Sequence, residues 1–507
     1  MVTAAGIVWS AGDALAGCGA AVAAVAGFSW WRVRHRSGAR VAGVAAVAGV
    51  AGVSAGLVAV GVVGAGYGLA TALRAEAAAR HPITTAFGTA APVTVIPSES
   101  AVSVGSGRLM FRATLRYLRA DESSGRVVVF ARAVDVGDVM AGRPVRFTAR
   151  ISRPKRRDLT VATLVAVGRP VWGRAGAVQR VAHIVRTRFA AGVRHVLPAD
   201  QAAMLPALVL GDTSAVTATT RTDFRTAGMT HLTAVSGANV TIVCAAVLLS
   251  ARLIGRRAAV VLAGLALVAF VVLVQPSASV LRAAVMGALT LAAMLSARRR
   301  QAIPALSATV LILLAVAPQL AVDVGFALSV AATAALVVIA PAWSRRLTGR
   351  GWPKVAADAF AVAAAAQMVT APLVAGISGR FSVVAVAANL LVAPVIATIT
   401  VLGTAAAAWA VLWPGCAGLL IRFTGPEVWW VLRVAHWAAR VPGAGVSVPS
   451  GVAGLAVVGG ATVLILVLWR WHWFRATVLW TAVAVAGTLA AWSVSDAAAG
   501  MPGVRAA

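Results

Sequence analysis

Residues 258–274 read AAVVLAGLALVAFVVLV, an uncharged apolar run that follows Arg257 and ends before Gln275. A run of this composition and length is too apolar for the surface of a soluble protein and is typical of a helix that crosses a membrane. Similar runs recur along the chain, which is 60% hydrophobic and has a mean hydropathy of +0.88. The sequence therefore predicts a polytopic α-helical membrane protein.

Basic loops between the apolar runs predict the topology. Arginines follow the first run, Ala4–Phe28, and no basic segment precedes it, so we expect no cleavable signal peptide and an outer N-terminus. A second run, Val41–Leu73, returns the chain to the outer side. Ten more crossings are expected after His231, including a tight hairpin at Ser382–Trp413 that Pro394 permits. About twelve spans are expected in all.

The part of the chain from Arg74 to about Thr230 has a different character. It lacks a run of about 20 apolar residues, so we expect it to be extramembrane, on the outer side. Short alternating segments such as Arg126–Arg132 and Val145–Ile151 are separated by turn residues and predict a small extracytoplasmic β domain, possibly OB-fold-like. Ala175–Leu197 has helical spacing and predicts a basic amphipathic helix at the membrane surface or, equally, a helix that covers the β domain.

These patterns divide the chain into six parts. The parts are two N-terminal transmembrane helices (1–73), the β-rich domain (74–174), the amphipathic helix with a linker (175–230), a helical core (231–413), a region with a tryptophan-rich interfacial helix at Gly425–Arg440 (414–450), and two C-terminal transmembrane helices with a short tail (451–507).

The formal net charge is +30, and arginine supplies nearly all of it. One explanation of this excess of arginine is codon bias together with basic loops that set the topology, and the other is contact with a polyanion. Between Arg74 and Arg225 there are 23 Arg and Lys against 10 Asp and Glu, a net charge near +13. Such a surface would concentrate a phosphate backbone with salt-sensitive affinity.

Cysteine and histidine usage predicts neither a metal nor another cofactor. The three cysteines, Cys18, Cys244 and Cys416, lie in apolar stretches, and the seven histidines never cluster as zinc hydrolases require. No nucleotide-hydrolysing Gly-rich loop is present, so any transport must be driven by a partner motor or the proton gradient.

Polar residues recur at the edges of the apolar runs or inside them. Arg282 lies about one turn inside a span, has no carboxylate in its own segment, and must face protein or water. We expect its partner to be Asp212, Asp223 or Asp323. The other polar residues could have purely structural roles. Ser236, Ser329 and Thr370 could bond a carbonyl one turn back. Asp323 could cap a helix, and Gln367 and Asn389 could form hydrogen bonds between helices.

Five motifs follow one another in a fixed order: Gly211-Asp-Thr-Ser; Phe224-Arg-Thr-Ala-Gly-Met-Thr-His-Leu-Thr-Ala-Val-Ser-Gly; Pro276-Ser-Ala-Ser-Val-Leu-Arg; Gly325-Phe-Ala-Leu-Ser; and Gln367 and Asn389, each five residues before a proline. This order, over roughly Pro198–Thr400, resembles the competence domain of the ComEC family of DNA-uptake channel proteins. The N-terminal half resembles the same family only in layout.

The resemblance implies a multi-pass channel that imports single-stranded DNA across the cytoplasmic membrane during natural transformation. It also implies a DNA receptor and a cytoplasmic motor or separate nuclease as partners. The expected DNA path comprises Asp212, Asp223, Arg225, His231, Ser236, Asn239, Arg282, Asp323, Gln367 and Asn389. The expected DNA-binding surface comprises Arg108, Arg112, Arg116, Arg146, Arg150, Arg153, Lys155, Arg156 and Arg157.

Two departures from the family pattern narrow this expectation. Full-length members often add a metallo-β-lactamase-like domain, but no His-x-His-x-Asp-His run occurs here, so we expect no nuclease activity and no enzyme in this polypeptide. Asn239 stands where the family more commonly has His, which allows hydrogen bonding but not titration.

Two other classes of function remain as alternatives. A secondary transporter also uses polar residues near the membrane midplane, but it needs no basic extramembrane domain and should show an internal repeat. An intramembrane hydrolase would use Ser236 with a histidine from another span, and His231 and His436 are poorly placed for that role.

Overall fold

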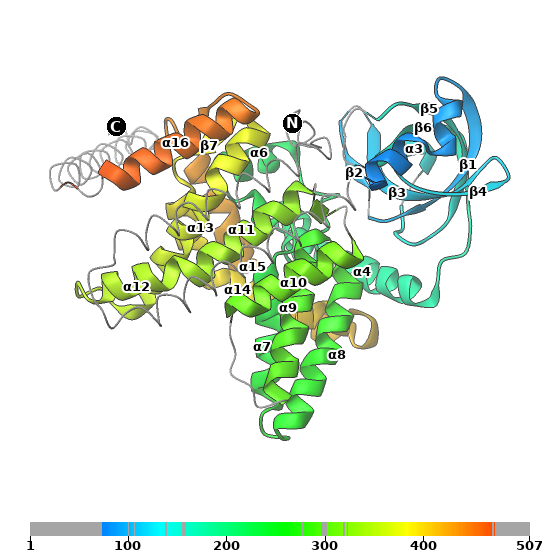
Figure 1. Cartoon of the computed structure of the whole chain (residues 1–507). Helices are drawn as coiled ribbons and strands as arrows, with labels where there is room; N and C mark the ends of the chain where they lie inside the picture. Colours follow the sequence, from blue (N-terminus) through cyan, green and yellow to red (C-terminus); the bar gives the residue numbers. More distant parts are fainter. Residues whose placement is uncertain are drawn as a thin grey trace, which may run out of the picture.

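The structure is a computed structural model that describes residues 73–99, 101–105, 107–136, 139–154, 159–275, 277–295, 302–317, 320–321, 323–468 and 471. Within these ranges a small β domain stands beside a larger helical domain (Figure 1). The first two expected spans and the last one, Ala476–Val494, lie outside the described residues, as do Lys155, Arg156 and Arg157.

The β domain is a closed barrel. Its strands are β1 (Ala90–Pro97), β2 (Val102–Ser103), β3 (Arg108–Leu118), β4 (Asp121–Arg132), β5 (Val145–Ser152) and β6 (Thr160–Trp172), with η1 (Pro82–Ala86) and the short helix α3 (Ala133–Val136). The sheet order is β1-β5-β6-β4-β3-β2, and a β1–β3 pairing closes it. The β4–β6 pair is parallel, and the other pairs are antiparallel.

Alternating side chains explain why these segments form a barrel. Along β5 every second residue is buried, from Val145 through Phe147 and Ala149 to Ile151, while the arginines between them face outward. Period-two burial is the pattern of a strand with one face on a core. The prediction of a small β domain is therefore confirmed, and the five long strands form one closed barrel.

The helical domain begins at α4 (Ala177–Val196) and runs to the end of the described chain. Its helices are α5 (Ala199–Leu210), α6 (Ala218–Thr226), η2 (Thr230–Leu232), α7 (Gly237–Ala251), α8 (Arg256–Val274), α9 (Ala278–Leu295), α10 (Ala302–Val316), α11 (Val324–Val338), α12 (Ala340–Thr348), α13 (Lys354–Ser378), α14 (Ala385–Leu412), α15 (Pro414–Arg440) and α16 (Val452–Leu468). Two short strands, β7 (Arg380–Ser382) and β8 (Gly445–Ser447), pair with each other.

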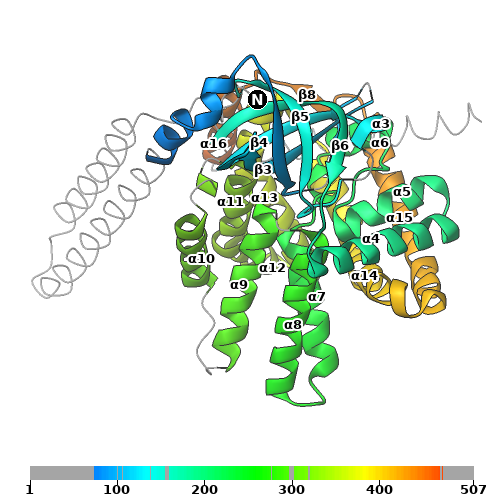
Figure 2. The same ribbon diagram turned by 90° about the vertical axis from the view of Figure 1, so that its right-hand side faces the viewer.

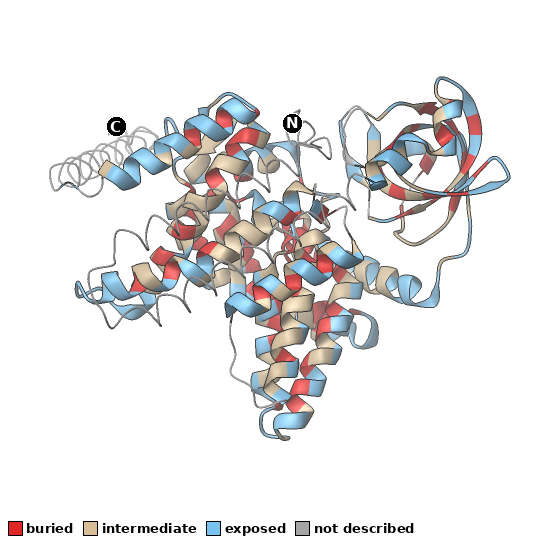
Figure 3. Ribbon diagram, viewed as in Figure 1, coloured by how far each residue is buried: buried red, intermediate tan, exposed pale blue. Residues whose placement is uncertain are grey.

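Within the described residues, five helical segments are long and apolar enough to cross a membrane: 256–274, 278–295, 324–348, 354–378 and 385–412. The outward face of α8 is apolar too, since it exposes Val261, Leu265, Val268 and Val272. Exposed apolar stripes of this kind are expected where lipid replaces water as solvent. Figure 3 shows buried residues gathered where helices meet and α16 largely exposed. The chain is a membrane protein.

Helix α5 lies at the centre of the largest core cluster. From Met204 to Leu210 every residue is buried, including Pro206 inside the helix. Helices α4, α14 and α15 pack around it, and Figure 2 shows α4 and α5 beside the upper end of the vertical α7–α8 pair. An apolar helix that is buried all round is a core element.

Three expectations about the helices are wrong. Helix α4 packs on α14 and α15 through Phe189 and Val193, so it does not cover the β domain. Ser382–Trp413 is not a tight hairpin, because α14 continues through Pro394 as one helix. Gly425–Arg440 is not a separate helix, since it is the second half of α15, which packs along α14.

Candidate functional site

Arg282 lies in the first turns of α9, and its side chain is 94% buried inside the helical domain. Its Nε donates to Ser329 Oγ on α11 at 2.8 Å, and its Nη1 lies 3.3 Å from Met286 Sδ one turn further along α9. Ser329 Oγ is also 3.2 Å from Ser279 Oγ. The buried guanidinium is thus held by neutral groups, and no described carboxylate pairs with it.

The start of α7 packs directly against this guanidinium. A Cβ at Gly237 would lie 2.6 Å from Arg282 Nη2 and 3.3 Å from Ala283 Cβ. Only a glycine allows this approach without a shift of the arginine. The glycine at the helix start is therefore explained by the guanidinium that it meets.

Asn239, 95% buried, connects α7 to the end of α5. Its Nδ2 donates to the Leu208 carbonyl at 3.1 Å, and its Oδ1 accepts from Ser236 Oγ at 3.2 Å. The last four carbonyls of a helix lack partners within the helix, so Asn239 satisfies one of them. Ser236 consequently does not bond a carbonyl one turn back.

Arg186 on α4 was not predicted to have a role in this region. Its Nη1 donates to the carbonyls of Leu210 and Leu273, each at 3.1 Å. Leu210 is the last residue of α5 and Leu273 the last but one of α8, so one arginine satisfies carbonyls at two helix C-termini, where a cation is also favoured by the helix dipole. The sequence places Arg186 outside the apolar stripe of α4, which hides this role.

Each of the three aspartates expected to pair with Arg282 has another partner. Asp323 Oδ1 caps α11 by accepting from the Phe326 amide at 2.8 Å, so the plainer expectation for Asp323 is confirmed. Asp223 lies 3.1 Å from His436 Nδ1 on α15. Asp212 accepts from the Ser214 amide at 3.1 Å. The prediction of a carboxylate partner for Arg282 is wrong, because the Ser329 hydroxyl takes that place.

Gln367, one of the expected path residues, lies near the start of α14. Gln367 Nε2 lies 3.5 Å from the Ser382 carbonyl, and Ser382 Oγ donates to the Thr226 carbonyl at 2.7 Å. A Cβ at Gly228, where φ is +72°, would lie 2.5 Å from Ala385 Cβ. The chain just before η2 is therefore pressed against the start of α14.

The path residue Asn389 and the hydroxyl of Thr370 each bond within their own helix. Asn389 Nδ2 donates to the Ala385 carbonyl of its own helix at 2.8 Å and does not join two helices in this way. Thr370 Oγ1 bonds the Ala366 carbonyl one turn back, as the plainer expectation had it. His231 on η2 and Arg225 on α6 are exposed.

The comparisons with known proteins concern the same helices. A family model described as "Competence protein" matches residues 208–473, more than half of the chain. The chain belongs to the Competence protein family. The match begins at the end of α5 and includes Ser236, Asn239, Arg282 and Ser329, so the constellation described above lies inside the family domain. No curated protein and no solved structure matches the chain.

Family membership supports a role in competence and DNA uptake, and the β domain lies outside the matched residues. Strand β1 lies between β3 and β5, and its Thr94 is paired with Tyr117 on one side and Arg146 on the other. Arg116, Tyr117, Arg146 and Arg150 are all exposed. The barrel of this competence protein therefore carries an arginine-rich face, β3-β1-β5, with one aromatic ring on it.

The other arginines expected on the DNA-binding surface are placed differently. Arg112 lies 3.7 Å from Glu99, and the Arg153 guanidinium lies 6.0 Å from the centre of the Phe87 ring. Arg108 is exposed at the beginning of β3. The Arg112 charge is therefore partly offset, whereas Arg116, Arg146 and Arg150 have no described acidic partner.

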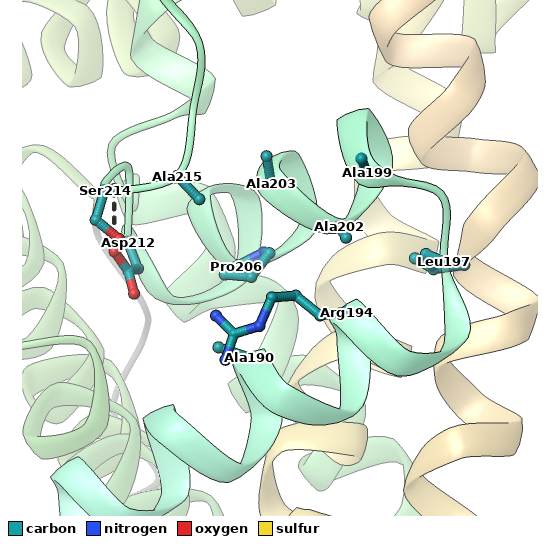
Figure 4. A pocket seen from close by; sticks show the side chains of 10 residues that line it. All are labelled: Ala190, Arg194, Leu197, Ala199, Ala202, Ala203, Pro206, Asp212, Ser214 and Ala215. Carbon is teal, nitrogen blue, oxygen red and sulfur yellow. Dashed lines mark hydrogen bonds between the residues drawn. The ribbon is translucent and has the colours of Figure 1, made fainter.

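Asp212 lies in a side pocket of about 370 Å³ between α4 and α5 (Figure 4). The pocket is lined mainly by alanines, and its charged groups are Asp212 and Arg194, whose guanidinium points toward the Asp212 end. The two side chains are not within ion-pair distance in the described structure. Asp212 thus belongs to the wall of this pocket, which Arg282 does not line.

Proposed function

We propose that the protein forms the channel through which single-stranded DNA crosses the cytoplasmic membrane during natural transformation. The observation that carries the proposal is Arg282, a buried guanidinium without a described carboxylate partner inside the domain that defines the family. A buried charge in a membrane domain faces protein or a water-filled path and marks a functional site by default.

The partners of Arg282 suit a transient anion. A carboxylate would neutralise the guanidinium permanently, whereas the hydroxyl of Ser329 leaves its charge available. Guanidinium groups bind phosphate oxygens through paired N–H donors. A phosphodiester passing Arg282 would exchange its hydrogen bonds with water for those of the arginine. The neutral hydroxyls of Ser329 and Ser279 would leave binding weak enough for release.

The topology follows the basic helix ends. Arg252 and Arg256 lie where α7 meets α8, and Arg345 and Arg346 lie in the last turns of α12, which the positive-inside rule places in the cytoplasm. The opposite ends of these helices, with η2 and the start of α7, are then outside. The β domain precedes this outer end and would be extracytoplasmic, as in the twelve-span arrangement expected from the sequence.

The arginine-rich β3-β1-β5 face would collect the strand before it reaches the membrane. Because Arg116, Arg146 and Arg150 share this face with a single exposed ring, Tyr117, binding would be mainly electrostatic and independent of sequence. A DNA receptor would deliver the strand, and a cytoplasmic motor or the proton gradient would drive it. A separate nuclease would degrade the other strand, and this chain would act without a metal or other cofactor and not as an enzyme.

Two features speak against the other classes of function. Helices α13 and α14 run continuously through Pro372 and Pro394, whereas secondary transporters bind solutes at interrupted helices. Ser236 donates to Asn239 rather than to a histidine among the described residues, so a hydrolytic Ser–His pair is not formed.

Import of labelled single-stranded DNA into the cytoplasm tests the proposal. A strain that carries Arg282→Ala should bind DNA at its surface normally and import at least about tenfold less, since roughly 1.4 kcal/mol of lost phosphate contact corresponds to that factor. Arg350→Ala, which removes an exposed arginine at the end of α12, is the control. Normal import by Arg282→Ala at normal protein abundance would sink the proposal.

A further inference from the structure

Three exposed side chains of α15 form a second arginine site. The Arg433 guanidinium lies 5.5 Å from the centre of the Trp429 ring and 5.3 Å from that of Trp437. Trp429 and Trp437 are 44% and 47% exposed, so large aromatic surfaces face outward here. Among the described residues no carboxylate pairs with Arg433. We call Trp429, Arg433 and Trp437 the tryptophan–arginine cluster.

Contacts of Trp430 and His436 hold this part of α15 on the helical domain. Trp430 Nε1 donates to the Leu391 carbonyl of α14 at 2.9 Å, and its ring meets the edge of Trp437 with 6.0 Å between centres. His436, adjacent to Trp437, contacts Asp223 on α6. The cluster therefore lies at the same end of α15 as α6 and η2.

A second pair of exposed tryptophans marks the other end of the α14–α15 hairpin. Trp409 and Trp413, 43% and 62% exposed, have ring centres 6.4 Å apart, and no described arginine stacks on them. Trp413 precedes Trp437 by 24 residues, which is about 36 Å along a helix at 1.5 Å per residue. A bilayer is about 30 Å thick in its hydrocarbon core and about 40–45 Å with head groups. The two aromatic groups are thus one bilayer apart.

Helix α15 is not one of the five most apolar segments, because Arg422 and Glu427 lie between its two aromatic ends, but its other outward side chains there fit a lipid-facing helix. Leu419 and Phe423 are exposed and apolar. Glu427, the only acidic residue of α15, has a buried Oε2 that is turned away from the surface. Arg422 lies about 14 Å from Trp413, within reach of the head groups if its long side chain extends toward them.

From these placements we infer that the α14–α15 hairpin crosses the bilayer, and that the tryptophan–arginine cluster binds the phosphate of a phospholipid head group in the outer leaflet. Tryptophan rings favour the head-group layer, and the fork of a guanidinium matches phosphate oxygens. The two rings hold the Arg433 fork between them while its N–H edge stays available. This site is independent of DNA transport and takes a lipid rather than a nucleic acid.

Crossing is tested by labelling single cysteines in sealed vesicles that contain the full chain with Cys18, Cys244 and Cys416 replaced by serine. Trp413→Cys and Trp437→Cys should react with a membrane-impermeant maleimide from opposite sides. Reaction of both from one side would overturn the inference and restore the interfacial placement of α15.

Phosphate binding is tested by native mass spectrometry of the delipidated full chain titrated with dioleoylphosphatidylglycerol, with dioleoylglycerol as the phosphate-free probe. Arg433→Ala should weaken retention of the phospholipid about tenfold, and Arg433→Lys should weaken it less. The Trp409→Ala/Trp413→Ala variant is the matched control and should retain phospholipid normally. Unchanged retention by Arg433→Ala, or displacement of the lipid by a single-stranded oligonucleotide, would overturn the assignment.

Discussion

Gly237 lies against Arg282 so closely that a Cβ on the glycine would be 2.6 Å from the arginine Nη2. The two residues belong to motifs that are 45 positions apart, Ser236-Gly237 and the first turns of α9. The contact explains why residue 237 is a glycine, since a Cβ there would push the guanidinium aside. Two motifs of the family domain therefore meet at the buried Arg282 guanidinium, which is suited to binding an anion such as a DNA phosphate.

Gly237→Ala should therefore displace the Arg282 guanidinium and reduce DNA import. Because Nη2 is the flexible end of a long side chain, it can move away from the added methyl group, so we expect a small loss of stability and a larger loss of import. Gly264→Ala is the matched control, because a Cβ there meets nothing within 4 Å and alanine favours a helix by about 1 kcal/mol. Import assays and thermal unfolding of both variants check this. Equal import by the two variants would show that the close approach has no functional consequence.

Asn239→Ala should destabilise the helical domain by about 1–3 kcal/mol, because the Leu208 carbonyl loses its buried donor. Asn239→Asp should cost more, since a carboxylate would face that carbonyl. Asn389→Ala is the control, because the Asn389 amide bonds only within its own helix and its loss should change little. Denaturation of the purified variants measures the difference. Equal destabilisation by Asn239→Ala and Asn389→Ala would argue against a bridging role.

The sequence is informative where one physical pattern dominates. Alternation along β5 predicts its buried face because a strand repeats every two residues. Arg282 is predicted inside its helix because it lies about one turn after Pro276. The cap at Asp323 follows from its position before an apolar run. These are local properties, so they can be read from a few neighbouring residues.

The sequence misleads where tertiary packing overrides a local signal. Pro394 suggests a turn, yet α14 continues through it. The chain reverses near Trp413 instead, so the predicted pair of adjacent helices occurs, but its turn comes later than predicted. Prolines are tolerated in membrane helices because neighbouring groups satisfy the freed backbone. The role of Arg186 is equally hidden, because Leu210 and Leu273 are brought to it only by the fold.

The Arg116→Ala/Arg146→Ala/Arg150→Ala variant should bind single-stranded DNA with a weaker salt dependence. Each lost phosphate contact lowers the slope of log K against log salt by about 0.7 for single strands, so three contacts give a change of about 2. Arg132→Ala is the control, because Asp135 at 2.6 Å already offsets the Arg132 charge. Fluorescence anisotropy with a labelled oligonucleotide, measured on the full chain in nanodiscs, gives both slopes. Identical slopes would exclude the β3-β1-β5 face.

The β domain should lose stability in acid through His81. Its Nδ1 accepts from the Ile83 amide at 3.2 Å, and its Nε2 lies 3.3 Å from Ser123 Oγ. Burial lowers the pKa of His81 below its usual value near 6.5, and a backbone hydrogen bond at Ser124 opposes the shift. The unfolded chain therefore binds the proton more readily, so stability falls as pH drops below about 6.5 toward the folded pKa. Unfolding of segment 74–174, which has its own core, should show this decline, and His81→Asn should flatten it. A decline equally steep in His81→Asn would assign the acid sensitivity to other groups.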